Sequence, residues 1–319
     1  NGCEGDAFTV TVTVDPEPLV ADQTVTVCSD VAIGYTIQGD VDTPLVASYN
    51  LISIVDNGLV GSISNQGLGN TLPSDALIGD VWTNDTANSV EVVYTLVPIG
   101  ANGCEGDEFT VTVTVNPEPV VGDQSAFVCS DQALGIDFGP SSSVAASTYN
   151  ITALTLNGLT VSSGGAGVSI GLSASDLSDD AFTNTTPSAV DVVYTVVPVT
   201  SDGCEGDAFT VTVTVNPEPV VDDQTVTVCS DVAIGYTIEG DVDTPVVATY
   251  NLTNVESNGL VGSGTNQGIG NGLSAGALVN DVWTNDTANS VDVVYTLVPI
   301  GDNGCEGDAF TVTVTVDPE

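Results

Sequence analysis

Residues 8–14 spell Phe-Thr-Val-Thr-Val-Thr-Val, a strict alternation of apolar side chains with threonine. Successive side chains of a β-strand point to opposite faces, so a period of two predicts a strand with one buried face. The same seven letters return at 109–115, 209–215 and 310–316. The stretch therefore predicts a β-protein in which one type of strand recurs.

The chain carries an internal repeat with a step of 100 or 101 residues, seen in a Gly-Cys-Glu-Gly-Asp motif with cysteines at 3, 104, 204 and 305. A second series, Cys-Ser-Asp, begins at Cys28, Cys129 and Cys229. Residues 1–17 recur letter for letter at 303–319, and we expect the chain to be a piece of a longer array. The predicted parts are the last strand of a preceding repeat plus a linker at 1–18, followed by repeats at 19–119, 120–219 and 220–319.

Each repeat is predicted to be an immunoglobulin-like β-sandwich. No stretch has helical periodicity, and clusters of Gly, Asn, Asp and Pro separate short segments of alternating or apolar character. Seven short strands in about 100 residues are typical of this fold. In the first repeat the strands are expected near 23–28, 32–37, 45–54, 58–64, 76–82, 89–97 and 107–115.

A short proline-bearing linker follows each of the recurring strands, with Asp/Asn-Pro-Glu-Pro at 15–18, 116–119 and 216–219. Proline lacks the backbone N–H that a sheet needs and keeps the preceding residue extended. A linker this short and this rich in proline acts as a stiff spacer. We therefore expect an extended, semi-rigid array of all-β repeats.

The motifs also resemble a known family. Thr-Val-Cys-Ser-Asp at 26–30, Tyr-Thr-Leu-Val-Pro at 94–98, Asn-Gly-Cys at 102–104 and Phe-Thr-Val-Thr-Val-Thr-Val-Asn-Pro-Glu-Pro at 109–119 look like the PKD-like, immunoglobulin-fold repeats of large Bacteroidota cell-surface proteins of the gliding or adhesin type. This resemblance implies a secreted protein of the outer-membrane surface, in which such repeats serve as spacers. The acidic composition also resembles the extender domains of calcium-dependent bacterial adhesins.

The charge is one-sided: 43 Asp and Glu residues stand against no Lys, Arg or His, which gives a net charge of -43. Without cationic side chains, binding to nucleic acids or to anionic membranes is not expected. Schiff-base, Ser–His and Cys–His catalysis are excluded because they need Lys or His. Hydrophobic residues make up 42% of the chain, which argues against disorder, and no apolar run approaches the length of a membrane span.

Two cysteines per repeat, without His or Cys-x-x-Cys motifs, favour disulfides in an oxidising compartment over zinc. We expect pairing within each repeat: Cys28 with Cys104, Cys129 with Cys204, and Cys229 with Cys305. One objection is that in a plain immunoglobulin topology the first strand ends at the opposite pole from the loop before the last strand. The alternative, which joins Cys28 to Cys204 of the next repeat, stays open.

Carboxylates beside the cysteines are candidate calcium ligands, since Ca²⁺ accepts six to eight hard oxygen ligands in flexible geometry. Disulfides within repeats would gather three acids per repeat, namely Asp30, Glu105 and Asp107, then Asp131, Glu205 and Asp207, then Asp231, Glu306 and Asp308. A weaker candidate lies at the junctions, where Glu118 is expected to face Asp123, and Glu218 to face Asp222 and Asp223. Solvated surface acid is the alternative for both sets.

No catalytic residue is expected, because the paired carboxylates recur in every repeat and aromatic residues make up only 5% of the chain. Trp82, Phe182 and Trp283 occupy equivalent strand positions and are expected in the core, with Tyr94 and its equivalents Tyr194 and Tyr295 facing inward. Thr86 and Thr287 match a weak pattern for O-glycosylation that the family resemblance implies.

The sequence thus predicts a non-catalytic stalk or filament region of an extracellular bacterial adhesin, stiffened by disulfides and calcium. Its partners would be neighbouring repeats of the same chain. One alternative is a repeated glycan- or protein-binding module. Another is a polymerising filament subunit, in which the strand at 7–14 completes the sandwich of another copy.

Overall fold

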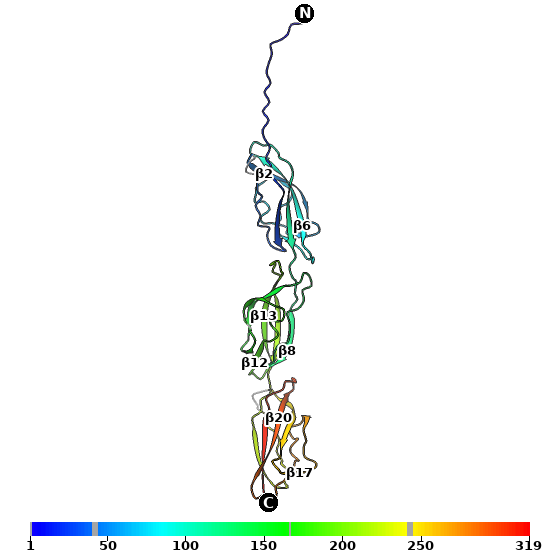
Figure 1. Ribbon diagram of the computed structural model, residues 1–319, viewed down its shortest axis with the longest axis vertical. Helices are drawn as coiled ribbons and strands as arrows, with labels where there is room; N and C mark the ends of the chain where they lie inside the picture. The colour runs from blue at the N-terminus through cyan, green and yellow to red at the C-terminus, as the bar shows by residue number, and fades with distance from the viewer. Residues whose placement is uncertain (1, 40–43, 166, 241–244) are drawn as a thin grey trace. The chain divides into compact units, whose positions relative to one another are not determined.

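The computed structural model describes residues 2–39, 44–165, 167–240 and 245–319. Every regular element in these residues is a β-strand, and the strands form three successive sandwich repeats (Figure 1). The predicted all-β fold class is confirmed. Contacts divide the chain into two compact units, 1–121 with 140–148 and 198–207, and 122–139 with 149–197 and 208–319.

The main sheet of the first repeat has five strands in the order β1-β7-β6-β2-β4. The first strand runs parallel to the last, and all other neighbours are antiparallel. Two short strands, β3 and β5, pair separately. The bounds are β1 Gln23–Cys28, β2 Val46–Val55, β3 Val60–Gly61, β4 Gly69–Leu72, β5 Trp82–Thr83, β6 Val90–Gly100 and β7 Phe109–Asn116.

The second and third repeats use the same order, with parallel first and last strands. The second repeat contains β8 Gln124–Cys129, β9 Thr148–Thr155, β10 Thr160–Ser163, β11 Ser169–Leu172, β12 Ala181–Thr183, β13 Val190–Val199 and β14 Phe209–Asn216. The third contains β15 Gln224–Cys229, β16 Val247–Glu256, β17 Val261–Gly262, β18 Gly270–Leu273, β19 Trp283–Thr284, β20 Val291–Gly301 and β21 Phe310–Asp317.

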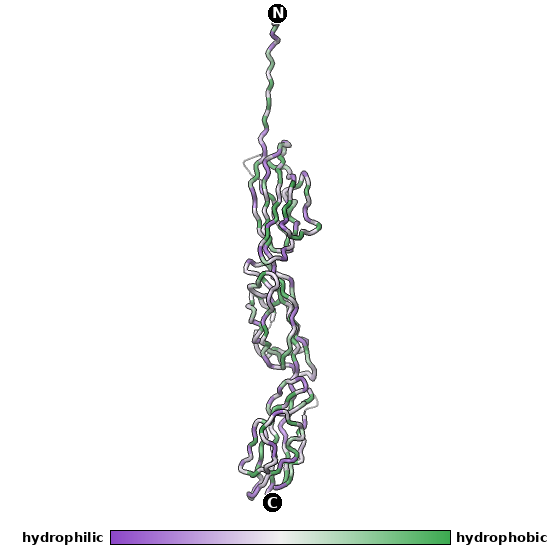
Figure 2. The backbone as a smooth tube through the Cα atoms, turned by 90° about the vertical axis from the view of Figure 1, so that its right-hand side faces the viewer, coloured by the Kyte–Doolittle hydropathy of each residue, from purple (hydrophilic) through white to green (hydrophobic). Residues whose placement is uncertain are grey.

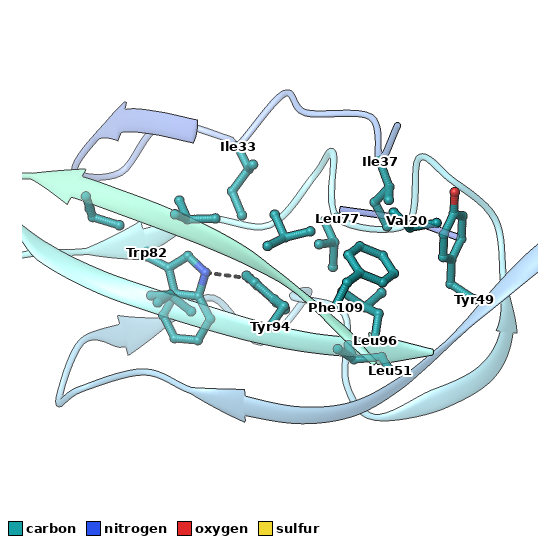
Figure 3. Close-up of a cluster of buried hydrophobic side chains, with 14 of the residues drawn as sticks. Val20, Ile33, Ile37, Tyr49, Leu51, Leu77, Trp82, Tyr94, Leu96 and Phe109 are labelled. Atoms are coloured by element: carbon teal, nitrogen blue, oxygen red, sulfur yellow. Dashed lines mark hydrogen bonds between the residues drawn. The ribbon is translucent and has the colours of Figure 1, made fainter. Parts of the chain in front are cut away.

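The alternating strand is the centre of each sandwich. In β7 the valines are fully buried and the threonines between them half-buried, as the period of two predicts. The buried face packs against Leu51, Leu77 and Leu96, and Tyr49 meets Phe109 edge to face with 5.9 Å between ring centroids (Figure 3). The inward position predicted for Trp82 and Tyr94 is confirmed.

The second layer is less regular than the sequence predicts. Residues 32–37 and 76–82 were expected to be strands, but 32–37 form only one isolated bridge and 76–82 are mostly turns. Successive short turns place Ile78 N 3.1 Å from the Asp75 carbonyl and Asp80 N 3.1 Å from the Leu77 carbonyl. This series of turns buries Leu77 completely. Its carbonyls still accept hydrogen bonds from the facing segment, since Ile33 N donates to Asp80 O. Apolar side chains at the spacing of a strand are here buried by turns.

Candidate functional site: the disulfide junctions between repeats

Two disulfides join consecutive repeats. Cys28 bonds Cys204 and Cys129 bonds Cys305, with Cα atoms 5.4 and 5.6 Å apart and a sequence separation of 176 in both. Each bridge links the end of a first strand to the loop before the last strand of the next repeat. The predicted pairing within repeats is wrong, and the structure has the alternative arrangement.

The parallel pairing of β1 with β7 is the physical reason. Cys28 lies opposite Asn116, the last residue of β7, whereas Cys104 precedes the start of that strand. Eight residues of β-strand span roughly 25 Å, and a disulfide bridges Cα atoms only about 4.4–6.8 Å apart. Cys28 and Cys104 therefore belong to opposite poles of one sandwich, which was the objection raised by the sequence.

Three cysteines are free thiols: Cys3 and Cys229 are exposed, and Cys104 is half-buried. The predicted bridges of Cys104 and Cys229 are therefore not present. Both occupy the positions that form bridges elsewhere in the chain, Cys229 as the end of a first strand and Cys104 in the loop before a last strand. Both bridges in the structure join cysteines of neighbouring repeats, so Cys104 does not bond to the first-strand cysteine of its own repeat.

Close contact with the linker allows only glycine at the middle position of the Glu-Gly-Asp motif. A Cβ atom on Gly106 would lie 2.0 Å from the Pro18 carbonyl oxygen, and one on Gly206 would lie 1.9 Å from that of Pro119. Either distance is a steric overlap, so only glycine lets the cysteine loop lie against the linker. The motif that suggested calcium is thus required by backbone contact.

The linkers are hydrogen-bonded as well. Asn102 Nδ2 donates to the Pro16 carbonyl at 3.2 Å, and Asn303 Nδ2 donates to that of Pro217 at 3.0 Å. The second repeat has Asp202 in place of this asparagine and holds its linker with serines instead. Ser143 Oγ donates to the Glu118 carbonyl at 2.7 Å. The loop at 140–143 therefore takes the place of the asparagine contact.

The aspartate of Cys-Ser-Asp has a local role. Asp30 has a φ of 58°, and Asp131 and Asp231 have 59° and 60°, in the left-handed region that aspartate tolerates better than most residues. Its carboxylate accepts hydrogen bonds from the hydroxyls of Ser29 and Thr83. Turn geometry accounts for this aspartate without a ligand.

Acidic residues nevertheless gather at each disulfide. Burial raises the pKa of Glu118 and, together with the nearby negative charges of Asp30, Asp207 and Asp85, brings it to about 7. Burial also raises the pKa of Glu218, together with the charges of its two aspartate neighbours. A cleft of about 240 Å³ beside the second disulfide is lined in part by Asp131, Glu218 and Asp308.

These groups differ from the predicted calcium sets. Asp30 influences Glu118 together with Asp207 of the next repeat, because the disulfide joins neighbours. Glu105, Glu205 and Glu306 each form a backbone bridge in their hairpin loop, with Ile99, Val199 and Ile300. In the part of the chain that the structure describes, no group of three or more Asp, Glu or Cys residues has the geometry to hold a metal ion.

The junction aspartates bond to threonines at the start of the last strand. Thr210 N and Oγ1 donate to Asp123 Oδ1 at 2.6 and 2.9 Å, and Thr311 makes the same pair of contacts with Asp223. These hydrogen bonds lower the pKa of both aspartates. Asp123 and Asp223 therefore anchor the first strand to the last, a role that the sequence analysis missed.

A second missed residue is the buried aspartate beneath the tryptophan. Trp82 Nε1 donates to Tyr94 Oη at 2.7 Å, and Tyr94 donates to Asp80 Oδ2 at 2.8 Å (Figure 3 draws the first bond). Burial raises the pKa of Asp80, against hydrogen bonds that lower it. The equivalents Asp180 and Asp281 accept from Tyr194 and Tyr295. All three repeats enclose the tyrosine–aspartate bond, which stabilises the core, while Phe182 replaces the tryptophan in the second repeat.

Thr86 and Thr287 lie in an identical turn. Thr86 Oγ1 is 2.7 Å from Asn84 Oδ1 and 2.8 Å from the Asn88 carbonyl. Thr186 makes the same contacts in the second repeat, where the acceptor pattern is lost. The hydroxyl is thus part of the turn in every repeat, and glycosylation stays a prediction. No helix in the described residues is long and apolar enough to cross a membrane.

Comparison with solved structures finds chains of low sequence identity. The FN1–FN3 domains of chicken CNTN1 are 11% identical, with 95% of this chain and 98% of that one covered and a TM-score of 0.32. Mouse clustered PcdhgC3 EC1–3 is 14% identical, with 93% and 99% covered and a TM-score of 0.25. The sialic acid binding region of a Streptococcus sanguinis SK1 adhesin is 10% identical, with 97% and 79% covered and a TM-score of 0.24. These likenesses concern the fold alone.

A search of curated proteins finds no match. A model of one protein family, described as the PKD-like domain, matches three successive segments, 25–119, 126–219 and 226–319. Together they cover most of the chain. The protein belongs to the PKD-like domain family, in three tandem copies.

Proposed function

We propose that this chain is a structural spacer, a stalk or filament region of a secreted cell-surface adhesin, whose repeats are joined covalently to one another. The observation that carries the proposal is the overlap of the two disulfides. The loop closed by Cys28 and Cys204 contains Cys129, and the loop closed by Cys129 and Cys305 contains Cys204. Interlocked bridges join neighbouring repeats covalently. Bridges within repeats would leave the backbone linker as the only covalent connection between one repeat and the next.

The overlap provides two covalent paths between residues 28 and 305 that cross one bridge each, besides a shorter path that crosses both bridges through residues 129–204. One path crosses the first bridge and follows the backbone from 204 onward, and the other follows the backbone to 129 and crosses the second bridge. A single backbone break anywhere between these residues leaves the two ends of the chain connected. An exposed fibre under tension benefits from this redundancy, and a catalytic domain has no evident need of it.

Limited proteolysis tests the redundancy. The chain has no Lys or Arg for trypsin, so a Glu-specific protease is used at low extent. We expect singly nicked protein to run at full length on a non-reducing gel and to separate on a reducing gel. Cys28→Ser should lose this protection only for nicks between 28 and 129, and Cys129→Ser only for nicks between 204 and 305. Nicked wild-type chain that separates without reduction would refute the interlocked arrangement.

Stretching a single molecule tests the mechanical role. With both bridges closed, the shortest covalent path follows residues 1–28, crosses to 204, runs back to 129 and crosses to 305, so the oxidised chain should extend to about 120 residues, or roughly 420 Å. Breaking either bridge should lengthen this limit to about 144 residues, or roughly 500 Å, because the shortest path then crosses only the remaining bridge. Reduction of both should extend it to roughly 1,100 Å. A limit that stays the same after the loss of one bridge would contradict the proposal.

Small-angle scattering tests the spacer role itself. A compact body of 319 residues would have a radius of gyration of about 20 Å. A stiff row of three repeats must exceed this value clearly and keep a rod-like scattering profile. A compact particle, or a flexible chain of beads, would refute the spacer role even where the disulfides are correct.

Surface location and calcium are further parts of the proposal. Two disulfides are typical of an oxidising, extracellular compartment, and labelling of intact cells with an antibody against the repeats tests it. A net charge of -43 without any cationic side chain favours divalent cations as counterions. A rise in melting temperature with calcium relative to chelator supports calcium binding, and no shift removes it.

A further inference from the structure

The two cysteines of each bridge differ in exposure. In the first bridge Cys204 is 1% exposed, and in the second bridge Cys305 is 0% exposed. Their partners Cys28 and Cys129, at the ends of first strands, are half-buried. A reducing thiolate attacks one sulfur of a disulfide and expels the other. Since only the first-strand cysteine is within reach of solvent, attack is open at its Sγ alone.

The group expelled by this attack is the thiolate of the buried cysteine. Burial raises the pKa of a thiol, because a low-dielectric surrounding disfavours the charged form. A thiolate whose thiol has a raised pKa is a poor leaving group in thiol–disulfide exchange. Opening a bridge from its accessible side therefore places the negative charge on the less favourable of its two sulfurs.

Carboxylates surround the accessible side of the second bridge. The cleft of about 240 Å³ beside it is lined by Ser130 and Asp131, which directly follow Cys129, and by Glu218 and Asp308. The charges of Asp131 and Asp308 both act on Glu218, so the three carboxylates lie close together. No cationic side chain balances them, because the chain has no Lys, Arg or His. An attacking thiolate carries a charge of the same sign and is repelled.

The first bridge has an equivalent group of acids. Asp30 lies two residues after Cys28, and the charges of Asp30, Asp207 and Asp85 act on Glu118. Figure 2 shows hydrophilic stretches at the ends of the repeats. The combination of one buried sulfur and a group of carboxylates is therefore present at both bridges.

We propose that both bridges are protected against reduction by anionic thiols such as glutathione. Each bridge opens only by attack on its first-strand cysteine, and the carboxylates beside that cysteine slow the approach of negatively charged thiolates. A thiolate with a compensating positive charge opens the bridge faster. The inference goes beyond the spacer role and rests on the disulfides alone, so a compact particle in small-angle scattering would leave it intact.

Reduction of the second bridge then takes two steps. A thiolate forms a bond to Cys129 Sγ, the bond between the two Sγ atoms breaks, and the electron pair leaves with Cys305 Sγ, which takes a proton from water. A second thiolate attacks the sulfur of the small thiol in this mixed disulfide and expels the Cys129 thiolate. Two small thiols are thereby oxidised to one disulfide, and the bridge is reduced to two thiols.

The position of the first adduct tests the direction of attack. Free thiols of the oxidised chain are alkylated, glutathione is added briefly, and acid stops the exchange before protease digestion and mass spectrometry. We expect glutathione on Cys28 and Cys129, with none on Cys204 or Cys305. Equal amounts on both cysteines of a bridge would overturn the proposal, because both sulfurs would then be open to attack.

Three small thiols test the repulsion. As thiolates, mercaptoacetate is doubly negative, 2-mercaptoethanol singly negative and cysteamine zwitterionic. Each rate is expressed per thiolate and divided by the rate of the same thiol with an uncharged small disulfide. At pH 8 and about 0.01 M salt, cysteamine should open the bridges at least about tenfold faster than mercaptoacetate. The ratio should approach unity at about 1 M salt, where the Debye length is roughly 3 Å. Equal corrected rates at low salt would overturn the proposal.

A double variant identifies the charges responsible. Glu218→Gln with Asp308→Asn removes two carboxylates from the cleft beside the second bridge. At low salt, mercaptoacetate should open the second bridge at least about threefold faster than in wild type. The first bridge of the same molecule is the matched control and should keep its rate. An unchanged second bridge, or equal acceleration of both bridges, would overturn the proposal. Equal acceleration with cysteamine would also overturn it, because loosened packing and not lost charge would then be the cause.

Discussion

Residues 2–17 and 304–319 have the same sequence and contrasting surroundings. In the second copy the apolar face lies in the core of a sandwich, and Cys305 is bonded and fully buried. In the first copy the same face and Cys3 are exposed. A further copy of the motif adds a contrast in the linker, because Glu17 is exposed whereas Glu118, at the same place after β7, is half-buried among aspartates.

The comparison separates what the sequence of the strand decides from what its neighbours decide. The alternation determines which side chains would share a face. Burial, disulfide pairing and the pKa of the linker glutamate depend on residues far along the chain. Matched substitutions at equivalent positions test which properties depend on those surroundings.

The largest effect is expected from a charge in the strand. Val312→Asp puts a carboxylate at a fully buried position and should destabilise the third repeat by more than about 4 kcal/mol. Val10→Asp should change the melting of no repeat, since Val10 is exposed. Fluorescence follows both, because the two tryptophans, Trp82 and Trp283, report separately on the first and third repeats. Equal losses would show that the first copy is packed in solution.

Removal of the disulfide comes next. Cys305→Ser opens the bridge to Cys129 and should cost about 2–5 kcal/mol, as expected for closing a long loop. Cys3→Ser should cost nothing, because Cys3 is a free thiol. Urea unfolding under non-reducing conditions measures both. A destabilised Cys3→Ser chain would mean that Cys3 has a partner.

The linker glutamate should make stability depend on pH. Glu118 has a folded pKa of about 7 against 4.5 as its ordinary value, so the folded protein binds this proton more tightly than the unfolded chain. Its contribution is present below pH 4.5 and is lost as the pH rises toward 7. Glu118→Gln should therefore be more stable than wild type at pH 8, by less than about 1 kcal/mol after solvent screening, and equal to it at pH 4.

The exposed copy supplies the control. Glu17→Gln should follow the wild-type chain at both pH values, since Glu17 is exposed. Thermal melts at pH 4 and 8 compare the two variants. A gain for Glu118→Gln at pH 4 that vanishes at pH 8 would have the wrong sign and would contradict the assigned cause.

The smallest effect concerns a backbone position that differs between repeats. Thr71 has a φ of 60°, where Gly171 and Gly272 have 73° and 69°. A β-branched residue is strained in this region and glycine is not. Thr71→Gly should stabilise the first repeat by about 0.5–1 kcal/mol, and Gly272→Thr should destabilise the third by about 1 kcal/mol or more. Tryptophan fluorescence during urea unfolding measures each change, and equal stability before and after would rule out strain.

Much of the fold follows from local patterns. The period of two identified the buried faces of β6 and β7, and the tryptophan and tyrosine positions indicated the core. The irregular second layer did not follow, because turns bury Leu77 at a spacing that resembles a strand. Long-range hydrogen bonds such as those from Thr210 to Asp123 could not be predicted, because nothing in the sequence around either residue indicates its distant partner.

The junctions were predicted only in part. The cysteines and acids were identified as a connected set, but their grouping depended on the pairing of strands. Parallel pairing of β1 with β7 sends Cys28 toward the next repeat, and Asp30 therefore influences Glu118 together with Asp207. The sequence contained one sign of this outcome, the opposite poles of an immunoglobulin topology.

A disulfide map of the oxidised chain tests the central claim most directly. Free thiols are alkylated first, and the protein is then cut with Asp- and Glu-specific proteases without reduction. The account predicts peptides that join Cys28 to Cys204 and Cys129 to Cys305, with Cys3, Cys104 and Cys229 alkylated. Peptides that join Cys28 to Cys104 or Cys129 to Cys204 would show bridges within repeats and would contradict it.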